Sequence, residues 1–125
     1  MKYIIIILTL LITSSETETS QEFIGTWISE EDPNWKMVFT QAECTWYYEN
    51  EITEHYYYTV ANSSPQCDLE VPIETYTSYL TLTSKTDPKD KLCYEINGFA
   101  ETTIRRKTLS IRSLGKGGFF LFVKQ

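Results

Sequence analysis

The sequence predicts an all-β domain, an eight-stranded antiparallel up-and-down β-barrel. From Phe23 onward, β-branched and aromatic residues alternate with polar ones, and no apolar run at helical spacing exceeds about two turns. Short connections rich in Pro, Gly, Asn and Asp separate the alternating runs, so successive strands are expected to pair as hairpins. A chain of 125 residues has the length of one domain, and a sheet that closes on itself leaves no exposed edge.

Eight alternating runs are expected to form the strands. They cover residues 23–29, 35–40, 44–49, 55–61, 76–83, 92–96, 103–112 and 119–124. The connections at 31–34, 87–90, 97–98 and 115–118 contain Pro, Asn or Gly, which adopt the φ angles that tight turns require. The segment 62–75, with Pro65 and Pro72, is too long for a hairpin turn and is expected to form a flap over one end of the sheet.

The residues before the domain read as an export signal. In residues 1–15, Lys2 precedes an almost unbroken apolar run that small polar residues follow, which is the pattern of a signal peptide. Ten helical residues reach about 15 Å, roughly half of a bilayer core, so no stable membrane span is expected after cleavage, although an uncleaved anchor is the alternative. Residues 16–22 are polar and acidic and predict a flexible tether before the domain at 23–125. The protein is therefore expected to be exported, to the periplasm, the medium or the cell surface.

Composition argues against several classes of function. The net charge is −6, and cleavage of residues 1–15 would remove Lys2 and no acid, leaving a charge of −7 that repels nucleic acid. The single histidine, His55, rules out a metal site with two imidazoles, and three separated cysteines do not make a zinc site. No pair of residues marks a catalytic centre, so we expect no enzyme activity, no metal and no cofactor.

Strand alternation selects the side chains that should face the barrel interior. Because neighbouring residues of a strand point to opposite faces, half of the tryptophan and tyrosine cluster at 46–58 should point inward. The expected lining, mostly apolar with a few phenol hydroxyls, consists of Met37, Phe39, Trp46, Tyr48, Tyr56, Tyr58, Leu80, Leu82 and Tyr94. Such a lining suits a small hydrophobic molecule with one or two polar groups. The alternative is that these bulky rings fill the barrel and leave no room for a ligand.

Three cysteines in an exported protein favour one disulfide and one free thiol. In an up-and-down barrel, Cys44 begins its strand at the same end as the segment that holds Cys67, whereas Cys93 begins its strand at the opposite end. Topology therefore favours a bond between Cys44 and Cys67. A bond between Cys67 and Cys93 is the alternative, and it requires the long segment to fold back along the barrel wall.

Two segments resemble the lipocalin and calycin pattern: Gly25-Thr26-Trp27 in the first strand and the apolar last strand that ends at Lys124. In that superfamily a Gly-x-Trp opening places the Trp at the closed end of the barrel, under a basic side chain of the last strand. The resemblance implies structural roles for Gly25, Trp27 and Lys124, with the cation over the indole face. The segments 25–29, 93–98 and 117–119 are also similar to small exported lipocalin-like proteins of Bacteroidetes, flavobacteria especially, over residues 23–125.

Together these observations predict an exported, non-enzymatic lipocalin-like binding protein that holds a small hydrophobic ligand in its barrel. The alternative is a protein-binding module, or an inhibitor of an exported enzyme, with a filled barrel. The charge of −7 after cleavage and the outward half of the tyrosines motivate this alternative.

Overall fold

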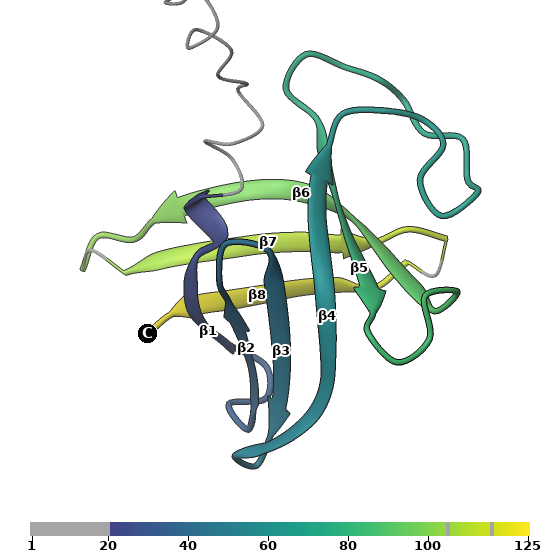
Figure 1. Cartoon of the computed structure of the whole chain (residues 1–125). Helices are drawn as coiled ribbons and strands as arrows, with labels where there is room; N and C mark the ends of the chain where they lie inside the picture. The colour runs from purple at the N-terminus through teal and green to yellow at the C-terminus, as the bar shows by residue number, and fades with distance from the viewer. Residues whose placement is uncertain (1–20, 105, 116) are drawn as a thin grey trace, which may run out of the picture.

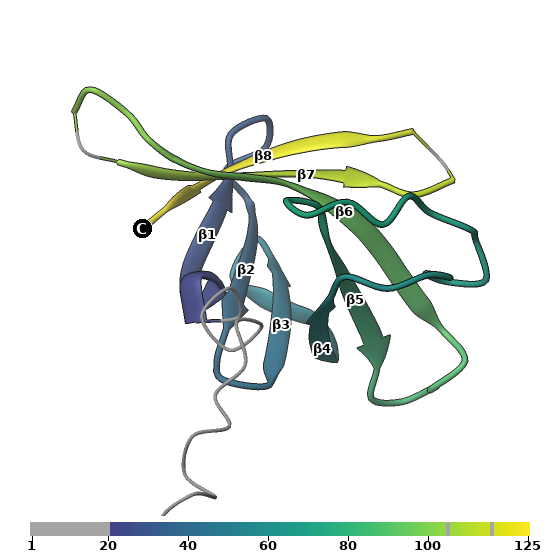
Figure 2. The ribbon, with the colours of Figure 1, turned by 90° about the horizontal axis from the view of Figure 1, so that it is seen from above.

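The described part of the chain is a closed β-barrel, which confirms the predicted fold class. The structure is a computed structural model that describes residues 21–104, 106–115 and 117–125 (Figure 1). The strands are β1 (Gly25–Ser29), β2 (Trp35–Phe39), β3 (Glu43–Tyr48), β4 (Glu51–Ala61), β5 (Ser78–Ser84), β6 (Lys91–Glu101), β7 (Lys107–Ser113) and β8 (Phe119–Lys124). Each strand is antiparallel to its neighbours in chain order, and β8 pairs with β1 to close the barrel. Seen from above, β8 returns to lie beside β1 (Figure 2).

The signal peptide expected at 1–15, and residues 16–20 of the expected tether, lie outside the described residues. Residues 21–23 form a short helical turn, and the first strand starts at Gly25. No helix in the part of the chain that the structure describes is long and apolar enough to cross a membrane.

Two hairpins differ from the prediction. The strand expected at 55–61 begins at Glu51, because Glu49 and Asn50 adopt positive φ angles of 52° and 68° and turn the chain at once. The turn expected at 97–98 lies inside β6 instead, where the pairing with β7 shifts between Ile96 and Gly98. Gly98 has a φ of 144°, so this position is a β-bulge that bends a long strand rather than a hairpin turn.

One end of the barrel is plugged by aromatic side chains. The fully buried Phe23 ring reaches down from the helical turn, with ring centroids 5.0 Å from both Phe39 and Phe99. Trp27 is also fully buried, and its Nε1–H donates to the carbonyl oxygen of Phe23 at 2.7 Å. Lys124 pairs with Trp27 across β1 and β8, and its Nζ lies 5.6 Å from the centroid of the indole. The predicted arrangement of Trp27 under Lys124 is therefore confirmed.

Gly25 is required at this end for a steric reason. A Cβ atom at position 25 would lie 2.7 Å from Cε of Lys124, and the φ of Gly25 is 134°. A glycine two residues before Trp27 thus leaves space for the lysine side chain to cross to the indole.

The predicted disulfide is wrong, because the bond joins Cys67 to Cys93 and leaves Cys44 free. Cys44 faces the barrel interior opposite Tyr56 and is fully buried, so it cannot reach a loop outside the wall. Cys93 precedes the inward-facing Tyr94 in β6, so its side chain faces outward. Cys67 lies on that outer side, and the Cα atoms of Cys67 and Cys93 are 6.0 Å apart.

The long loop 62–77 runs along the outer wall rather than over an end of the sheet. The disulfide fixes one point of the loop, and the hydroxyl of Tyr79, on the outer face of β5, donates to the carbonyl oxygen of Pro72 at 2.6 Å. Tyr79 is only 1% exposed as a result, although it points away from the barrel interior. The part of the loop around Cys67 therefore lies against the outside of the barrel, whereas the rest projects beyond the ends of β4 and β5 (Figure 1).

Candidate functional site

Most of the side chains predicted to line the barrel interior do face it. Seven of them are at most 6% exposed, and these are Met37, Phe39, Tyr56, Tyr58, Leu80, Leu82 and Tyr94. Trp46 is partly buried and packs against the same core. These residues form one continuous hydrophobic core through the barrel.

Tyr48 is the exception, and its predicted place in the lining is wrong. It is the last residue of β3 and is 42% exposed. Its hydroxyl donates to Oδ2 of Asp32 at 2.9 Å, across the rim of the barrel, and this bond to a carboxylate raises the pKa of Tyr48. Tyr48 has inward parity, but at the rim its ring turns toward Asp32 instead of entering the core.

The barrel contains a second aromatic layer, which we call the aromatic collar. Its members come from five strands and are Trp35, Trp46, Tyr56, Tyr94 and Phe120. The ring centroids form a chain: Tyr56 to Trp46 is 5.1 Å, Trp46 to Trp35 is 5.3 Å, Trp35 to Phe120 is 5.6 Å and Phe120 to Tyr94 is 6.2 Å. The collar thus runs around the inside of the barrel.

The aromatic collar lies at the end of the barrel opposite the Phe23 plug. Trp35 is the first residue of β2, whereas Phe39, which touches Phe23, is the last. Phe120 is likewise near the start of β8, and Lys124 at the plug is its last residue. Trp35 and Phe120 are only partly buried, so the collar end of the barrel exposes aromatic surface. At the plugged end, the aromatic side chains Phe23 and Trp27 are fully buried.

Polar groups of the collar remain without partners. The Nε1–H of Trp46 is buried and has no hydrogen bond in the described structure. The indole lies near the Cys44 thiol and acts to lower the pKa of that thiol. A sulfur atom is a weaker hydrogen-bond acceptor than an oxygen atom, so it does not satisfy the indole N–H. Among the described residues, the hydroxyls of Tyr56 and Tyr94 also have no hydrogen-bond partner. An unsatisfied buried donor costs about 1–3 kcal/mol, so the Nε1–H of Trp46 favours an added acceptor.

These polar groups lie close together and stay neutral. Burial raises the pKa of Tyr56 to about 12, with smaller contributions from the carboxylates of Glu54 and Asp90 and from Cys44. Burial, the nearby Tyr56 and Cys44 raise the pKa of Tyr94. Both phenols are therefore protonated hydrogen-bond donors at neutral pH, in a field that nearby acids make negative.

Two other reactive side chains, Cys44 and His55, lie on opposite faces of the barrel wall. Burial raises the pKa of the Cys44 thiol, which keeps it protonated and a poor nucleophile. His55 is exposed on the outer face of β4, with Nδ1 3.4 Å from Oγ1 of Thr45.

The sequence interpretation missed Trp35 and Phe120 as members of the site. Both share strand parity with predicted core positions, Trp35 with Met37 and Phe120 with Phe122, so alternation alone would have selected them. That they touch each other depends on barrel closure, which brings β2 and β8 to either side of β1.

Comparison of the chain with protein-family models, with curated proteins and with solved structures gives no match.

Proposed function

We propose that this protein is an exported, non-enzymatic binding protein of the lipocalin-like type, which takes a small, mostly apolar molecule at the collar end of its barrel. The observation that carries the proposal is the buried, unpartnered Nε1–H of Trp46, beside which the hydroxyls of Tyr56 and Tyr94 supply two more donors. The partly buried rings of Trp35 and Phe120 supply apolar contact area next to these donors. Burial of ligand area of this kind contributes about 25 cal/mol per Å².

The electrostatics favour a neutral ligand. Three donors call for an acceptor oxygen, but Glu54 and Asp90 raise the pKa of Tyr56 and so oppose a second negative charge nearby. A ketone, ester or alcohol oxygen accepts hydrogen bonds without that repulsion. We therefore expect an apolar carbonyl or alcohol compound to bind better than a carboxylate of the same length.

A fluorescent titration tests this proposal. A solvatochromic naphthyl ketone should bind saturably, brighten, and be displaced by 2-decanone at lower concentration than by decanoate. Trp46→Phe, Tyr56→Phe and Tyr94→Phe each remove one donor and keep the ring, so each should weaken binding by about 5- to 10-fold. Tyr47→Phe is the matched control, because Tyr47 lies on the same strand as Trp46 and faces outward under Lys36.

Two results would contradict the proposal. If the naphthyl ketone and the decanone do not bind, the collar end is filled by its own rings. If the three collar variants bind as tightly as Tyr47→Phe, the ligand sits elsewhere.

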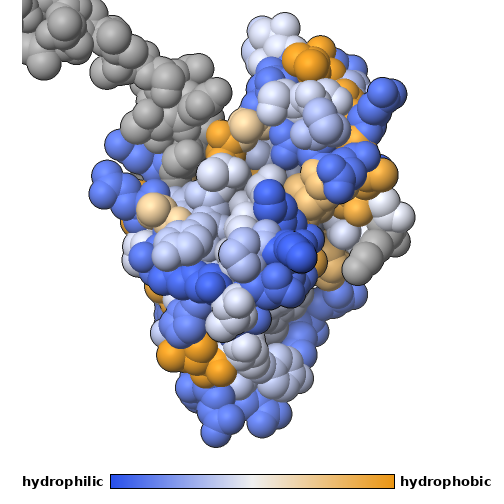
Figure 3. Space-filling view, turned by 45° about the vertical axis from the view of Figure 1, so that its right-hand side comes forward, coloured by the Kyte–Doolittle hydropathy of each residue, from blue (hydrophilic) through white to orange (hydrophobic). Residues whose placement is uncertain are grey.

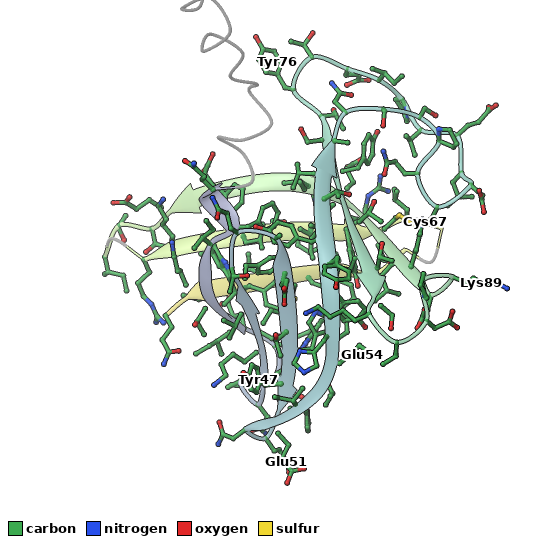
Figure 4. All side chains as sticks on the ribbon, viewed as in Figure 1. Tyr47, Glu51, Glu54, Cys67, Tyr76 and Lys89 are labelled. Atoms are coloured by element: carbon green, nitrogen blue, oxygen red, sulfur yellow. A yellow bond between two sulfur atoms is a disulfide. The ribbon has the colours of Figure 1, made fainter. Side chains whose placement is uncertain are left out.

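A second candidate function is protein binding through the tip of the loop 62–77. Tyr76 is 97% exposed and Ile73 is 63% exposed, and Tyr76 stands away from the barrel (Figure 4). Three acidic residues, Asp68, Glu70 and Glu74, lie in the same loop, so a basic partner protein fits this surface. Neutralising these acids should weaken capture of such a partner at low salt and have little effect at high salt, and a salt-independent interaction would argue against this candidate.

A further inference from the structure

The last strand, β8, is apolar on both of its faces. Phe120 and Phe122 point into the barrel, so Phe119, Leu121 and Val123 point outward. Phe119 is 59% exposed, and the other two outward side chains are partly buried. A continuous apolar run is typical of a strand that is covered on both faces. In the described structure, however, all three outward side chains of β8 keep contact with solvent.

The apolar surface continues onto β1, across the seam that closes the barrel. Ile28 pairs with Val123 and follows the inward-facing Trp27, so its side chain points outward. We call these four side chains the outer strip: Ile28, Phe119, Leu121 and Val123. Its border on β7 consists of small side chains, since Thr108 pairs with Val123 and Ser110 with Leu121. A second sheet can therefore approach the strip closely.

The wall on the other side of the barrel has a different character. Figure 3 shows the face that carries the loop 62–77, which is mostly hydrophilic, with hydrophobic residues in separate patches. In β4, the strand halfway around the barrel from β8, the outward residues include His55, Tyr57 and Thr59. The outer strip is therefore a feature of one wall and not a general property of the barrel surface.

The collar end of the outer strip is acidic. Glu30 and Glu31 stand beside Phe119 and border a hollow of about 310 Å³ with it. Both glutamates are exposed, and neither takes part in an ion pair within the residues that the structure describes. Asp32 follows them directly in the chain.

The cations near this end do not cancel its charge. The guanidinium of Arg112, on β7, is already bound to Glu95 at 3.1 Å. Lys36 lies on β2 with its Nζ 5.0 Å from the centroid of the Tyr47 ring, which belongs to β3 and is further from β8. Lys116 lies outside the described residues, and a single cation does not offset three consecutive acids.

The plugged end of the outer strip is basic. β7 pairs with β8 from its second residue onward, so Lys107 and the turn before it extend past the end of the barrel (Figure 2). In this turn Ile104 is 73% exposed. The N–H of Arg106 donates to Oγ1 of Thr102 at 3.1 Å, and its carbonyl oxygen accepts from the N–H of Thr102 at 2.8 Å. The sequence places three cations at 105–107 against the single acid Glu101, so the turn has excess positive charge.

The two charged ends lie on either side of Val123. The N–H of Glu30 donates to the carbonyl oxygen of Leu121 at 2.9 Å, which fixes the acidic end along β8. The basic end begins at Lys107, one residue before the partner of Val123 in β7. The ends are thus about three residues, or about 10 Å, apart along β8, with their midpoint beside Val123. A twofold axis through that midpoint would set the acidic end of each of two copies against the basic end of the other.

The same axis would bring the exposed apolar residues together. Leu121, Val123 and Ile28 would meet their own counterparts near the axis, with the two sheets packed face to face. Phe119 lies on the collar side of the axis and Ile104 on the plugged side, so the Phe119 ring of one copy would face the turn that carries Ile104 in the other. Burial of this apolar area contributes about 25 cal/mol per Å².

We infer that the outer strip is the interface of a twofold-symmetric dimer, in which a second copy of this chain covers the strip. Glu30 and Glu31 of each copy lie against Arg106 and Lys107 of the other. The inference does not rest on the proposed function, because the outer strip lies on the outside of the barrel wall and the aromatic collar lies inside.

Sedimentation analysis of the full chain over a range of concentrations tests the inference. At low salt the chain should shift from monomer to dimer as its concentration rises. Leu121→Glu places a charge at the centre of the strip and should weaken dimerisation by at least about tenfold. Thr59→Glu is the matched control, because Thr59 is exposed on the outer face of β4 and should tolerate the same charge without effect on the dimer.

Two charge-reversed variants test the symmetry. Glu30→Lys/Glu31→Lys makes both ends of the strip positive and Arg106→Glu/Lys107→Glu makes both negative, so each variant alone should dimerise at least about tenfold more weakly. An equimolar mixture of the two should recover the dimer, because every contact then joins opposite charges. Lys89→Glu/Lys91→Glu changes the net charge as much as the second variant does, but away from the strip, and should leave dimerisation unchanged.

Three outcomes would overturn the inference. The first is a native chain that stays monomeric at every concentration. The second is a Leu121→Glu variant that dimerises as tightly as Thr59→Glu, which would mean that another surface associates, such as the apolar run at 3–12. The third is a mixture of the two charge-reversed variants that stays monomeric, which would mean that the acidic and basic ends do not face each other.

Discussion

Removal of the disulfide should cost the protein a large share of its stability. The bond joins residues separated by 26 positions, and the chain-entropy relation for a loop of that length gives about 3.5 kcal/mol at 25 °C. Domains of this size are typically stable by only about 5–15 kcal/mol. The double variant Cys67→Ser/Cys93→Ser should therefore remain folded but lose stability by about 2–4 kcal/mol.

Urea unfolding followed by tryptophan fluorescence measures this loss. With a urea dependence of about 1–3 kcal/mol per M, the midpoint should fall by at least about 0.7 M. A reducing agent should destabilise the native chain by the same amount and leave the double variant unchanged. Cys44→Ala is the control, because it removes the free thiol and should keep the sensitivity to reduction.

Two results would refute this reasoning. If Cys44→Ala abolishes the sensitivity to reduction, the pairing of the cysteines is different. If the double variant loses less than about 1 kcal/mol, the loop 62–77 is already ordered by its own contacts, such as the Tyr79 bond to Pro72, and the cross-link constrains little.

Three further changes test the interior of the barrel. Gly25→Ala places a Cβ 2.7 Å from Cε of Lys124 and should lower stability by about 1–3 kcal/mol in thermal unfolding. Gly98→Ala is the control, because Gly98 has a similar φ but no atom within 4 Å of the added Cβ. An equal loss of stability in both variants would mean that backbone strain, and not the contact with Lys124, causes the loss. Phe23→Ala removes the plug and should cost about 3–5 kcal/mol in urea unfolding, and a loss below 1 kcal/mol would mean that the plug is not part of the cooperative core. The pKa of Tyr56 is raised from 10.0 to about 12, so its contribution to stability is complete below pH 10 and is lost as the pH rises toward 12. Tyr56→Phe should therefore reduce the fall in unfolding free energy between pH 10 and pH 12. An unchanged dependence of the unfolding free energy on pH would contradict the raised pKa.

Local sequence signals determined much of the barrel. Strand parity selected Met37 and Leu82 for the core because alternation is a property of the extended chain itself. The Gly25-Thr26-Trp27 segment and Lys124 met as expected, since the first and last strands must pair when the barrel closes.

The sequence did not distinguish between local structures that favour the same residue types, such as a hairpin turn and a β-bulge. Asn97-Gly98 reads as a hairpin turn, and the same positive φ of Gly98 also serves a β-bulge, which the continued pairing with β7 selects here. Tyr48 has the parity of an interior residue, but its depth in the barrel depends on where β3 ends against its neighbours, and that end lies at the rim beside Asp32.

The sequence by itself therefore determined that eight strands form and, for most of their residues, which face of the sheet each one occupies, because those choices depend on neighbours along the chain. Only the tertiary structure decided that Cys67 bonds to Cys93, that the loop 62–77 lies on the outer wall, and that Trp35 meets Phe120 in the aromatic collar. These contacts join residues far apart in the chain, and their geometry is set by how the closed barrel packs rather than by any local preference.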